Sequence, residues 1–191
     1  MQLNSHQFEN TYQKLGINLD KLGCVMLDLE PVKFIPIGWE SFEIYLYHSK
    51  NRDRFWIDGW VCNRIPHITL LYGLLENAQN QSENIEAVLK DWDLDTVEIE
   101  DIGYFDSPYP DEPYYCIVAH IKRTPELLEG HHRLEFLPHI NTFPIYKPHM
   151  TVCYIAKVQG ETWRDELIQE LKEALIGAKL RISGLNLGGD K

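Results

Sequence analysis

This sequence has few basic residues and no long apolar run. It carries 18 Lys and Arg against 29 Asp and Glu, a formal net charge of −11. Because a long nucleic acid is held mainly by many Lys and Arg contacts to phosphate, this balance argues against such a partner and favours a nucleotide-sized one. No stretch approaches the roughly 18 apolar residues of a membrane span, so we expect no membrane partner.

The sequence also lacks paired cysteines, a glycine-rich phosphate loop and a metal-ligand pattern. The four cysteines are scattered without a CxxC pair, which favours buried free thiols in a reducing compartment. The first ten residues lack the apolar core of a secretion signal, so we expect a cytoplasmic protein. The eight histidines show no metal-ligand spacing, so we expect no metal and no cofactor.

Strand and helix patterns alternate along the 191 residues, a length that suits one domain with a substantial core. Strands are predicted over 23–29, 42–47, 66–73, 97–104, 114–121 and 180–187, and helices over 7–15, 79–92, 124–136 and 161–175. Thr124 followed by Pro125 is a typical helix start. Without a strict βαβ period, the pattern predicts an α+β fold and a single domain over 1–191, with 1–22 as an extension.

The most informative feature of the chain is a repeated motif of seven residues. Residues 66–72 read PHITLLY and residues 148–154 read PHMTVCY, so His67 and His149 lie 82 positions apart. One His-x-Thr strand taken alone is most simply a half-exposed structural strand. The matched pair, each copy with a preceding Pro and a following Tyr, instead favours a functional site.

The residue order within each copy predicts which side chains share a face. Because side chains alternate along a strand, Thr69 and Thr151 should point to the same side as the histidine of their own copy. Tyr72 and Tyr154 should point to the other side and pack in the core. Two such strands facing each other would place two imidazoles and two hydroxyls around one small anion.

These groups suit phosphodiester cleavage. An imidazole titrates near neutral pH, so one histidine can accept the proton of the nucleophile while the other donates a proton to the leaving oxygen. Threonine hydroxyls can donate hydrogen bonds to the non-bridging phosphate oxygens. The scheme needs no metal, and the symmetry of the motifs leaves open which histidine is the base.

Paired His-apolar-Thr motifs, one in each half of a chain of this length, resemble the 2H phosphoesterase superfamily. The resemblance covers the order of elements over most of residues 23–187. It implies a bilobal, pseudo-twofold fold, with two antiparallel sheets around a central cleft and helices outside. It also implies that His67 and His149 are the catalytic pair and that Thr69 and Thr151 bind phosphate oxygens.

A narrower resemblance concerns the residues around each motif. Residues 143–154 are similar to the second motif of phage proteins that cleave the cyclic oligonucleotides of bacterial antiphage (CBASS) signalling, and residues 69–74 resemble their first motif. This implies a phosphodiesterase for a small cyclic or 2′,5′-linked oligonucleotide, acting in the host cytoplasm if the chain is phage-borne.

Two alternative functions stay open. One is RNA end processing, as a 2′,3′-cyclic phosphodiesterase or a 2′,5′ RNA ligase-like enzyme. The other is a non-catalytic nucleotide-binding sponge, which the two intact motifs disfavour. The sequence does not indicate an oligomeric state.

Six further residues are candidates for substrate contacts. Bases stack on aromatic rings and phosphates attract cations, although packing or a solvated surface is an ordinary role for such side chains. The segment 129–132 is expected to be an exposed helix end. The candidates are the loop and N-terminal aromatics Tyr12, Trp56, Trp60 and Tyr109, and the motif-flanking cations Arg64 and Lys147.

Overall fold

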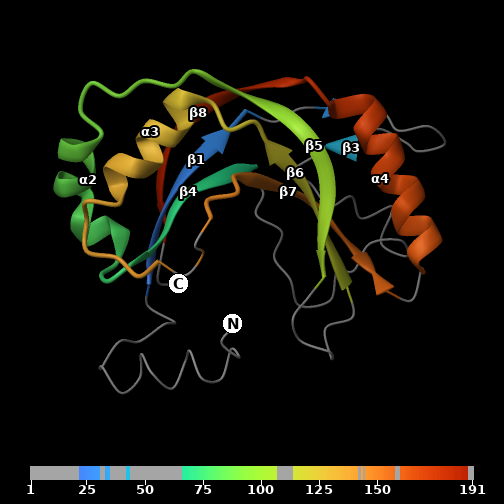
Figure 1. The fold of residues 1–191 in the computed structure, drawn as a ribbon, viewed down its shortest axis with the longest axis horizontal. Helices are drawn as coiled ribbons and strands as arrows, with labels where there is room; N and C mark the ends of the chain where they lie inside the picture. Colours follow the sequence, from blue (N-terminus) through green and yellow to red (C-terminus); the bar gives the residue numbers. More distant parts are fainter. Residues whose placement is uncertain are drawn as a thin grey trace, which may run out of the picture.

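The computed structural model describes residues 22–30, 33–34, 42–43, 66–106, 114–141, 143, 145–157 and 160–188. These form an arch, with helices α2 and α3 at one end, α4 at the other and the strands between them (Figure 1). The predictions of a helix over 7–15 and of strand residues 44–47 lie outside the described residues. In the described part, no helix is long and apolar enough to cross a membrane.

Six strands form one antiparallel sheet in the order β4-β1-β8-β5-β6-β7. Two three-stranded halves, β4-β1-β8 and β5-β6-β7, correspond to the two predicted sheets, and a short β5–β8 pairing joins them. The strands are β1 (Gly23–Leu29), β4 (His67–Leu74), β5 (Thr96–Asp106), β6 (Tyr114–Ile121), β7 (His149–Ala156) and β8 (Lys179–Gly188); β2 (Lys33–Phe34) and β3 (Phe42–Glu43) pair separately.

Among the described residues, the α-helices lie at the two ends of the sheet. Helix α3 (Pro125–Leu134) contacts β4, α2 (Ser82–Val88) contacts α3, and α4 (Glu161–Leu175) contacts β5. The predicted N-cap of α3 is confirmed, because the Thr124 hydroxyl accepts a hydrogen bond from the backbone N–H of Leu127. Antiparallel strands with separate helices confirm the α+β class.

The helix predicted over 79–92 is shorter than the sequence suggests. A 3-10 turn, η3 (Ala78–Gln81), precedes α2, and α2 ends at Val88. Asp91 then takes a left-handed conformation with φ of 61°, which a helix cannot continue. Trp92 leaves the helix, and its indole N–H donates to the Glu126 carbonyl at 2.8 Å. The apolar periodicity of the sequence therefore extends beyond Val88, the residue at which the helix ends.

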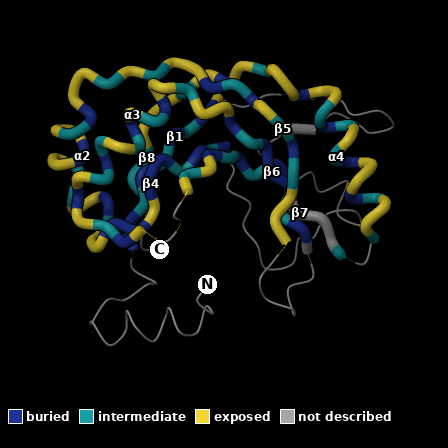
Figure 2. The backbone as a smooth tube through the Cα atoms, viewed as in Figure 1, coloured by how far each residue is buried: buried dark blue, intermediate teal, exposed yellow. Residues whose placement is uncertain are grey.

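Both halves share one hydrophobic core, shown as the buried parts of the strands and helices in Figure 2. Strand β1 alternates between buried and half-buried residues, as the sequence pattern predicts. Its buried side chains Val25, Leu27 and Leu29 pack in this core, while Cys24, Met26 and Asp28 lie on the opposite face. That second face is the concave face that leads to the motif residues of β4.

A β-bulge in β4 overturns the prediction for Tyr72. Val25 pairs with Leu71 and Met26 pairs with Thr69, so Leu70 is an extra residue on β4. Leu70 and Leu71 are both buried, and the alternation shifts by one residue after them. Tyr72 therefore shares the face of Thr69 and is 40% exposed instead of packing in the core. The side chain of Tyr154 lies outside the described residues.

Gly73 is required where β4 meets the segment after α3. Its φ is +107°, and an added Cβ would lie 2.4 Å from the Ile140 carbonyl oxygen. The Ile140 N–H donates to the Gly73 carbonyl at 2.8 Å, so the two backbones cannot separate without losing this bond. We expect Gly73→Ala to lower the free energy of unfolding by about 2–4 kcal/mol, measured by urea denaturation. Gly184→Ala, at a site with open space, is the matched control and should cost less than about 1 kcal/mol.

Candidate active site

The two motif strands are the edge strands of the two halves, and the curvature of the sheet brings them into contact. Strand β4 is one end of the sheet, β7 is the other, and residues of the two strands lie within contact distance. His67 and His149 are the first residues of these strands. The two copies of the motif, 82 positions apart, therefore meet at one place.

The His149 imidazole has a defined tautomer. Its Nδ1 lies 2.9 Å from the Lys147 carbonyl oxygen, which can only accept, so Nδ1 carries the proton and Nε2 is left as the basic atom. The Phe105 ring packs edge-on against the imidazole, with ring centroids 4.9 Å apart. Nδ1 is thus held by the backbone, and Nε2 remains for chemistry.

The surroundings of His149 favour its neutral form. Burial lowers the pKa of His149 below its usual value, the hydrogen bond to Lys147 acts in the opposite direction, and positive charge on His120 and His67 lowers the pKa further. The effect of His67 on the pKa of His149 shows that the two motif histidines lie within electrostatic reach of each other. His149 is therefore suited to accept a proton near neutral pH.

A third histidine, which the sequence interpretation missed, joins this group. His120 on β6 is the direct cross-strand partner of His149, and its ring lies 6.1 Å from that of Phe105. Gly103 leaves room for the imidazole, since a Cβ there would lie 2.8 Å from His120 Nε2. No sequence motif marks His120; only the β6–β7 register brings it beside His149.

The two threonines are half-buried and lie on the motif strands as predicted. Thr151 is paired with Val118, and its hydroxyl oxygen lies 3.8 Å from the Cys116 Sγ. The Thr69 backbone carbonyl accepts a hydrogen bond of 3.1 Å from the Tyr146 hydroxyl. Each threonine follows its histidine at i+2, so the hydroxyl and the imidazole of each copy share a face.

The first half places a carboxylate opposite His67. Asp28 on β1 is the cross-strand partner of His67. The Asn186 side-chain amide donates to both Asp28 carboxylate oxygens, at 3.0 and 3.1 Å. The two motif histidines therefore have different neighbours: Asp28 beside His67, and His120 beside His149.

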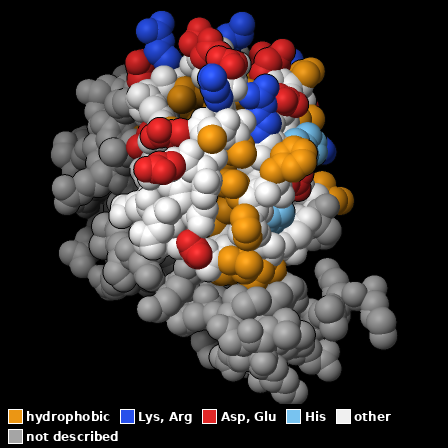
Figure 3. Space-filling view, turned by 90° about the vertical axis from the view of Figure 1, so that its left-hand side faces the viewer, with side chains coloured by type: hydrophobic (Ala, Val, Ile, Leu, Met, Phe, Trp, Pro, Cys, Tyr) orange, Lys and Arg blue, Asp and Glu red, His pale blue; other side chains and the backbone are white. Residues whose placement is uncertain are grey.

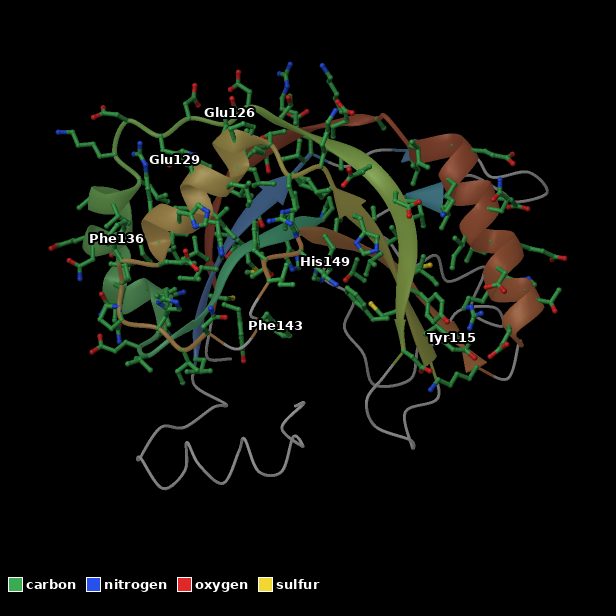
Figure 4. The ribbon with its side chains drawn as sticks, viewed as in Figure 1. Tyr115, Glu126, Glu129, Phe136, Phe143 and His149 are labelled. Carbon is green, nitrogen blue, oxygen red and sulfur yellow. The ribbon has the colours of Figure 1, made fainter. Side chains whose placement is uncertain are left out.

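A cavity of about 910 Å³ opens beside this group and extends to α3. Thr69, Phe105, Lys147 and His149 line the part of the cavity next to the motif strands. Figure 4 shows His149 on the inner side of the arch, with Phe143 below it. On the remaining sides lie Leu70, Leu71, Tyr72, Arg123, Leu128, His131, His132, Glu135, His139, Asn141, Phe143, Ile145 and Tyr146.

At the end of the molecule that carries α2 and α3, most charged side chains and the apolar side chains lie on different parts of the surface. In Figure 3, which faces this side of the molecule, acidic and basic side chains gather at the top, and hydrophobic side chains and histidines lie below them. Phe143 and Ile145, on the cavity rim, are 70% and 58% exposed. Such apolar rings and chains at the rim of a cavity are suited to contact a planar ligand group.

The prediction that residues 129–132 form an exposed helix end is wrong for Gly130, which is buried, and for His131. The His131 side chain is only 12% exposed, and Nδ1 donates to the Leu70 carbonyl at 2.7 Å. His131 also stacks on Tyr146, with centroids 3.9 Å apart and an interplanar angle of 9°. The helix turns this residue toward the β4 bulge, whereas His132 beside it stays exposed.

The predicted substrate contacts are only partly described. Lys147 is exposed and lines the cavity, next to the motif as expected. The other candidates, Tyr12, Trp56, Trp60, Arg64 and Tyr109, lie outside the described residues. Among the described side chains, no group of three or more His, Cys, Asp or Glu is arranged to hold a metal ion.

The cysteine prediction is met in part. Cys24 is a free thiol, and Cys153 is buried. Cys24 and Cys116 are half-buried, because both fall on the concave face beside the motif strands. Burial raises the pKa of Cys24, which keeps it as a thiol. Cys62 lies outside the described residues.

Paired His-x-Thr strands at two converging sheet edges define a two-histidine phosphoesterase architecture. The model of the 2′-5′ RNA ligase superfamily matches residues 40–189, which include both motifs, and the chain belongs to this family. This confirms the predicted 2H phosphoesterase membership and supports phosphoesterase activity in general.

Among solved structures, the chain is similar to Usb1 of Kluyveromyces marxianus. That match has 9% sequence identity and a TM-score of 0.48, and it covers 90% of this chain and 95% of Usb1. A second structure, Usb1 with uridine monophosphate, matches at 10% identity and a TM-score of 0.46 with the same coverage. No curated protein matches the sequence.

Proposed function

We propose that this chain is a metal-independent phosphodiesterase that cleaves cyclic oligonucleotide second messengers and so counters antiphage signalling. The observation that carries the proposal is the meeting of His67 and His149 at the contacting edges of β4 and β7. Each motif contributes one imidazole and one hydroxyl, the groups that proton transfer and phosphate binding require.

The two histidines take different roles in this proposal. The proton on His149 Nδ1 and the lowered pKa leave a neutral Nε2, which accepts the proton of the nucleophile. His67 then donates a proton to the leaving oxygen. Thr69 and Thr151 donate hydrogen bonds to the non-bridging oxygens, where negative charge develops in the transition state. Both proton transfers and the charge stabilisation use side chains alone.

The size and charge of the site favour a small oligonucleotide over a long one. The cavity of about 910 Å³ is at the upper end of small-ligand sites and adjoins Thr69 and His149. Lys147 and Arg123 supply local positive charge, although the chain has a net charge of −11. The similarity of residues 143–154 and 69–74 to phage cyclic-oligonucleotide phosphodiesterases points to a cyclic messenger.

RNA end processing is the second candidate function, and the description of the family as RNA ligases favours it. The two functions differ in substrate. We would incubate the protein in EDTA with 3′,5′-linked cyclic di- and trinucleotides, a cyclic trinucleotide with a 2′,5′ linkage, linear 2′,5′-oligoadenylate and an RNA with a 2′,3′-cyclic phosphate end. Cleavage of a cyclic oligonucleotide is the expected result. Turnover of the RNA end alone would assign the chain to RNA processing.

The pH dependence tests the role of His149. Because burial and neighbouring histidines lower its pKa, His149 loses its proton below the usual value of about 6.5. A base must be deprotonated, so kcat/KM should rise with pH, and the midpoint of this rise should lie below about pH 6.5. A pH–rate profile with the cleaved oligonucleotide checks this. A rising limb centred above pH 7 would assign the base role to another group.

A further inference from the structure

The two strands that carry the motifs are connected by a pair of side chains outside both motifs. Tyr146 precedes β7 and donates its hydroxyl proton to the Thr69 carbonyl at 3.1 Å. His131 on α3 donates from Nδ1 to the Leu70 carbonyl at 2.7 Å. The two rings stack at 3.9 Å, so each holds the other in place. We call His131 and Tyr146 the bulge clamp.

The clamp acts at the most irregular point of β4. The bulge interrupts the β1–β4 ladder at Leu70, and carbonyl groups in such a position need donors other than the regular ladder. The donors of the clamp satisfy the carbonyls of Thr69 and Leu70. This fixes the backbone at Thr69, whose hydroxyl faces the site.

The clamp also reaches the second motif through a short path. Tyr146 is followed directly by Lys147, whose carbonyl accepts the hydrogen bond from His149 Nδ1. The backbone that selects the His149 tautomer is therefore anchored to the backbone of Thr69. The sequence separation is large, 77 residues between Tyr146 and Thr69, but the structural path contains only two hydrogen bonds.

Burial shows that this contact is more than an incidental surface interaction. Burial strongly raises the pKa of the Tyr146 hydroxyl, so it remains a proton donor across the working pH range. Burial also lowers the pKa of His131, which favours the neutral ring that donates only from Nδ1. Both groups are thus kept in the protonation state that the two hydrogen bonds need.

We propose that His131 and Tyr146 are positioning residues that set the placement of Thr69 relative to His149, so that both reach the same phosphate. This rests on the proposed function for its catalytic consequence. Misplacing a catalytic group by about 1 Å can cost about 10² in rate. The clamp therefore affects turnover without touching the substrate's reacting atoms.

Tyr146→Phe tests the proposal most sharply, because it keeps the stacked ring and removes only the hydroxyl. We expect kcat to fall about tenfold, while KM changes less than about twofold. Tyr104→Phe is the matched control, since Tyr104 lies on the opposite face, where its ring packs against Arg164 of α4. Tyr104→Phe should keep the wild-type kcat. Wild-type kcat in Tyr146→Phe would overturn the proposal.

His131 separates the hydrogen bond from the stacking. His131→Asn retains a donor near the position of Nδ1, whereas His131→Phe retains the ring and loses the donor. We expect His131→Asn to keep more of the wild-type kcat than His131→Phe. Thermal unfolding of both variants would show whether each is folded at the temperature of the kinetic assay. The reverse order of kcat values would contradict a positioning role for the hydrogen bond.

A readout without turnover separates this proposal from the proposed function. Nitrogen-15 NMR of the imidazoles should show His149 protonated on Nδ1 in the wild type and in Tyr104→Phe. In Tyr146→Phe the Lys147 carbonyl loses its anchor, so the Nε2-protonated form should increase. If the wild type cleaves nothing, the proposed function fails, and this NMR comparison still decides the clamp: an unchanged tautomer overturns it.

Discussion

Replacing either motif histidine by alanine should nearly abolish phosphodiester cleavage. We expect His149→Ala and His67→Ala each to lower kcat/KM by about 10² to 10⁴-fold, because each variant removes one of the two proposed proton transfers. Initial rates of product formation from the best cyclic oligonucleotide, separated by chromatography, would measure this. The double variant should be little worse than either single variant, because the two histidines act as a unit.

The control for these variants is His132→Ala. His132 is exposed and lies on α3 rather than on a motif strand, and its Nδ1 pairs with Glu135 at 2.8 Å. The fold-loss in rate for His132→Ala should be at least about ten times smaller than the fold-loss for a motif histidine variant. If His149→Ala retained more than a tenth of the wild-type rate, the two-histidine mechanism would be wrong.

The threonine hydroxyls should have the next largest effect. Thr69→Ala and Thr151→Ala remove a proposed donor to the phosphate oxygens, and each should lower kcat/KM by about 10²-fold, with part of the loss in KM. Thr69→Ser and Thr151→Ser retain the hydroxyl and should recover most of the rate. The same kinetic assay measures kcat and KM for all four variants.

Thr96→Ala is the matched control for the threonines. Thr96 is an exposed residue at the start of β5, paired with Arg181 and away from the motif strands. Its rate should equal the wild-type rate. If the alanine variants at the motif threonines matched this control, the phosphate would be stabilised by other groups, and the roles of both threonines would be rejected.

The sequence predicts those features that depend on local pattern. Strand β1 and helix α4 begin and end where their apolar periodicity does, and Thr124 caps α3 through its own hydroxyl. The meeting of the motifs is predictable by resemblance, since the repeated PHxTxxY pattern is specific. Each of these predictions rests on patterns that are about a dozen consecutive residues long or shorter.

The features that could not be predicted depend on sheet register and on contacts between distant residues. Tyr72 faces the cavity because of one extra residue in β4, and no signal in HITLLYGL marks a bulge at Leu70. His120 joins the site only through its pairing with His149. The hydrogen bond between His131 and the Leu70 carbonyl joins residues 61 positions apart, a separation that no local sequence pattern covers.

Cleavage of a cyclic oligonucleotide by two-histidine catalysis is the activity that we propose for this chain. The most direct measurement is multiple turnover of a cyclic trinucleotide in EDTA, by the wild type and by the His67→Ala/His149→Ala variant, with substrate in at least about hundredfold excess. We expect the wild type to consume all of the substrate and the variant essentially none. Stoichiometric binding without product, or equal turnover by both proteins, would contradict it.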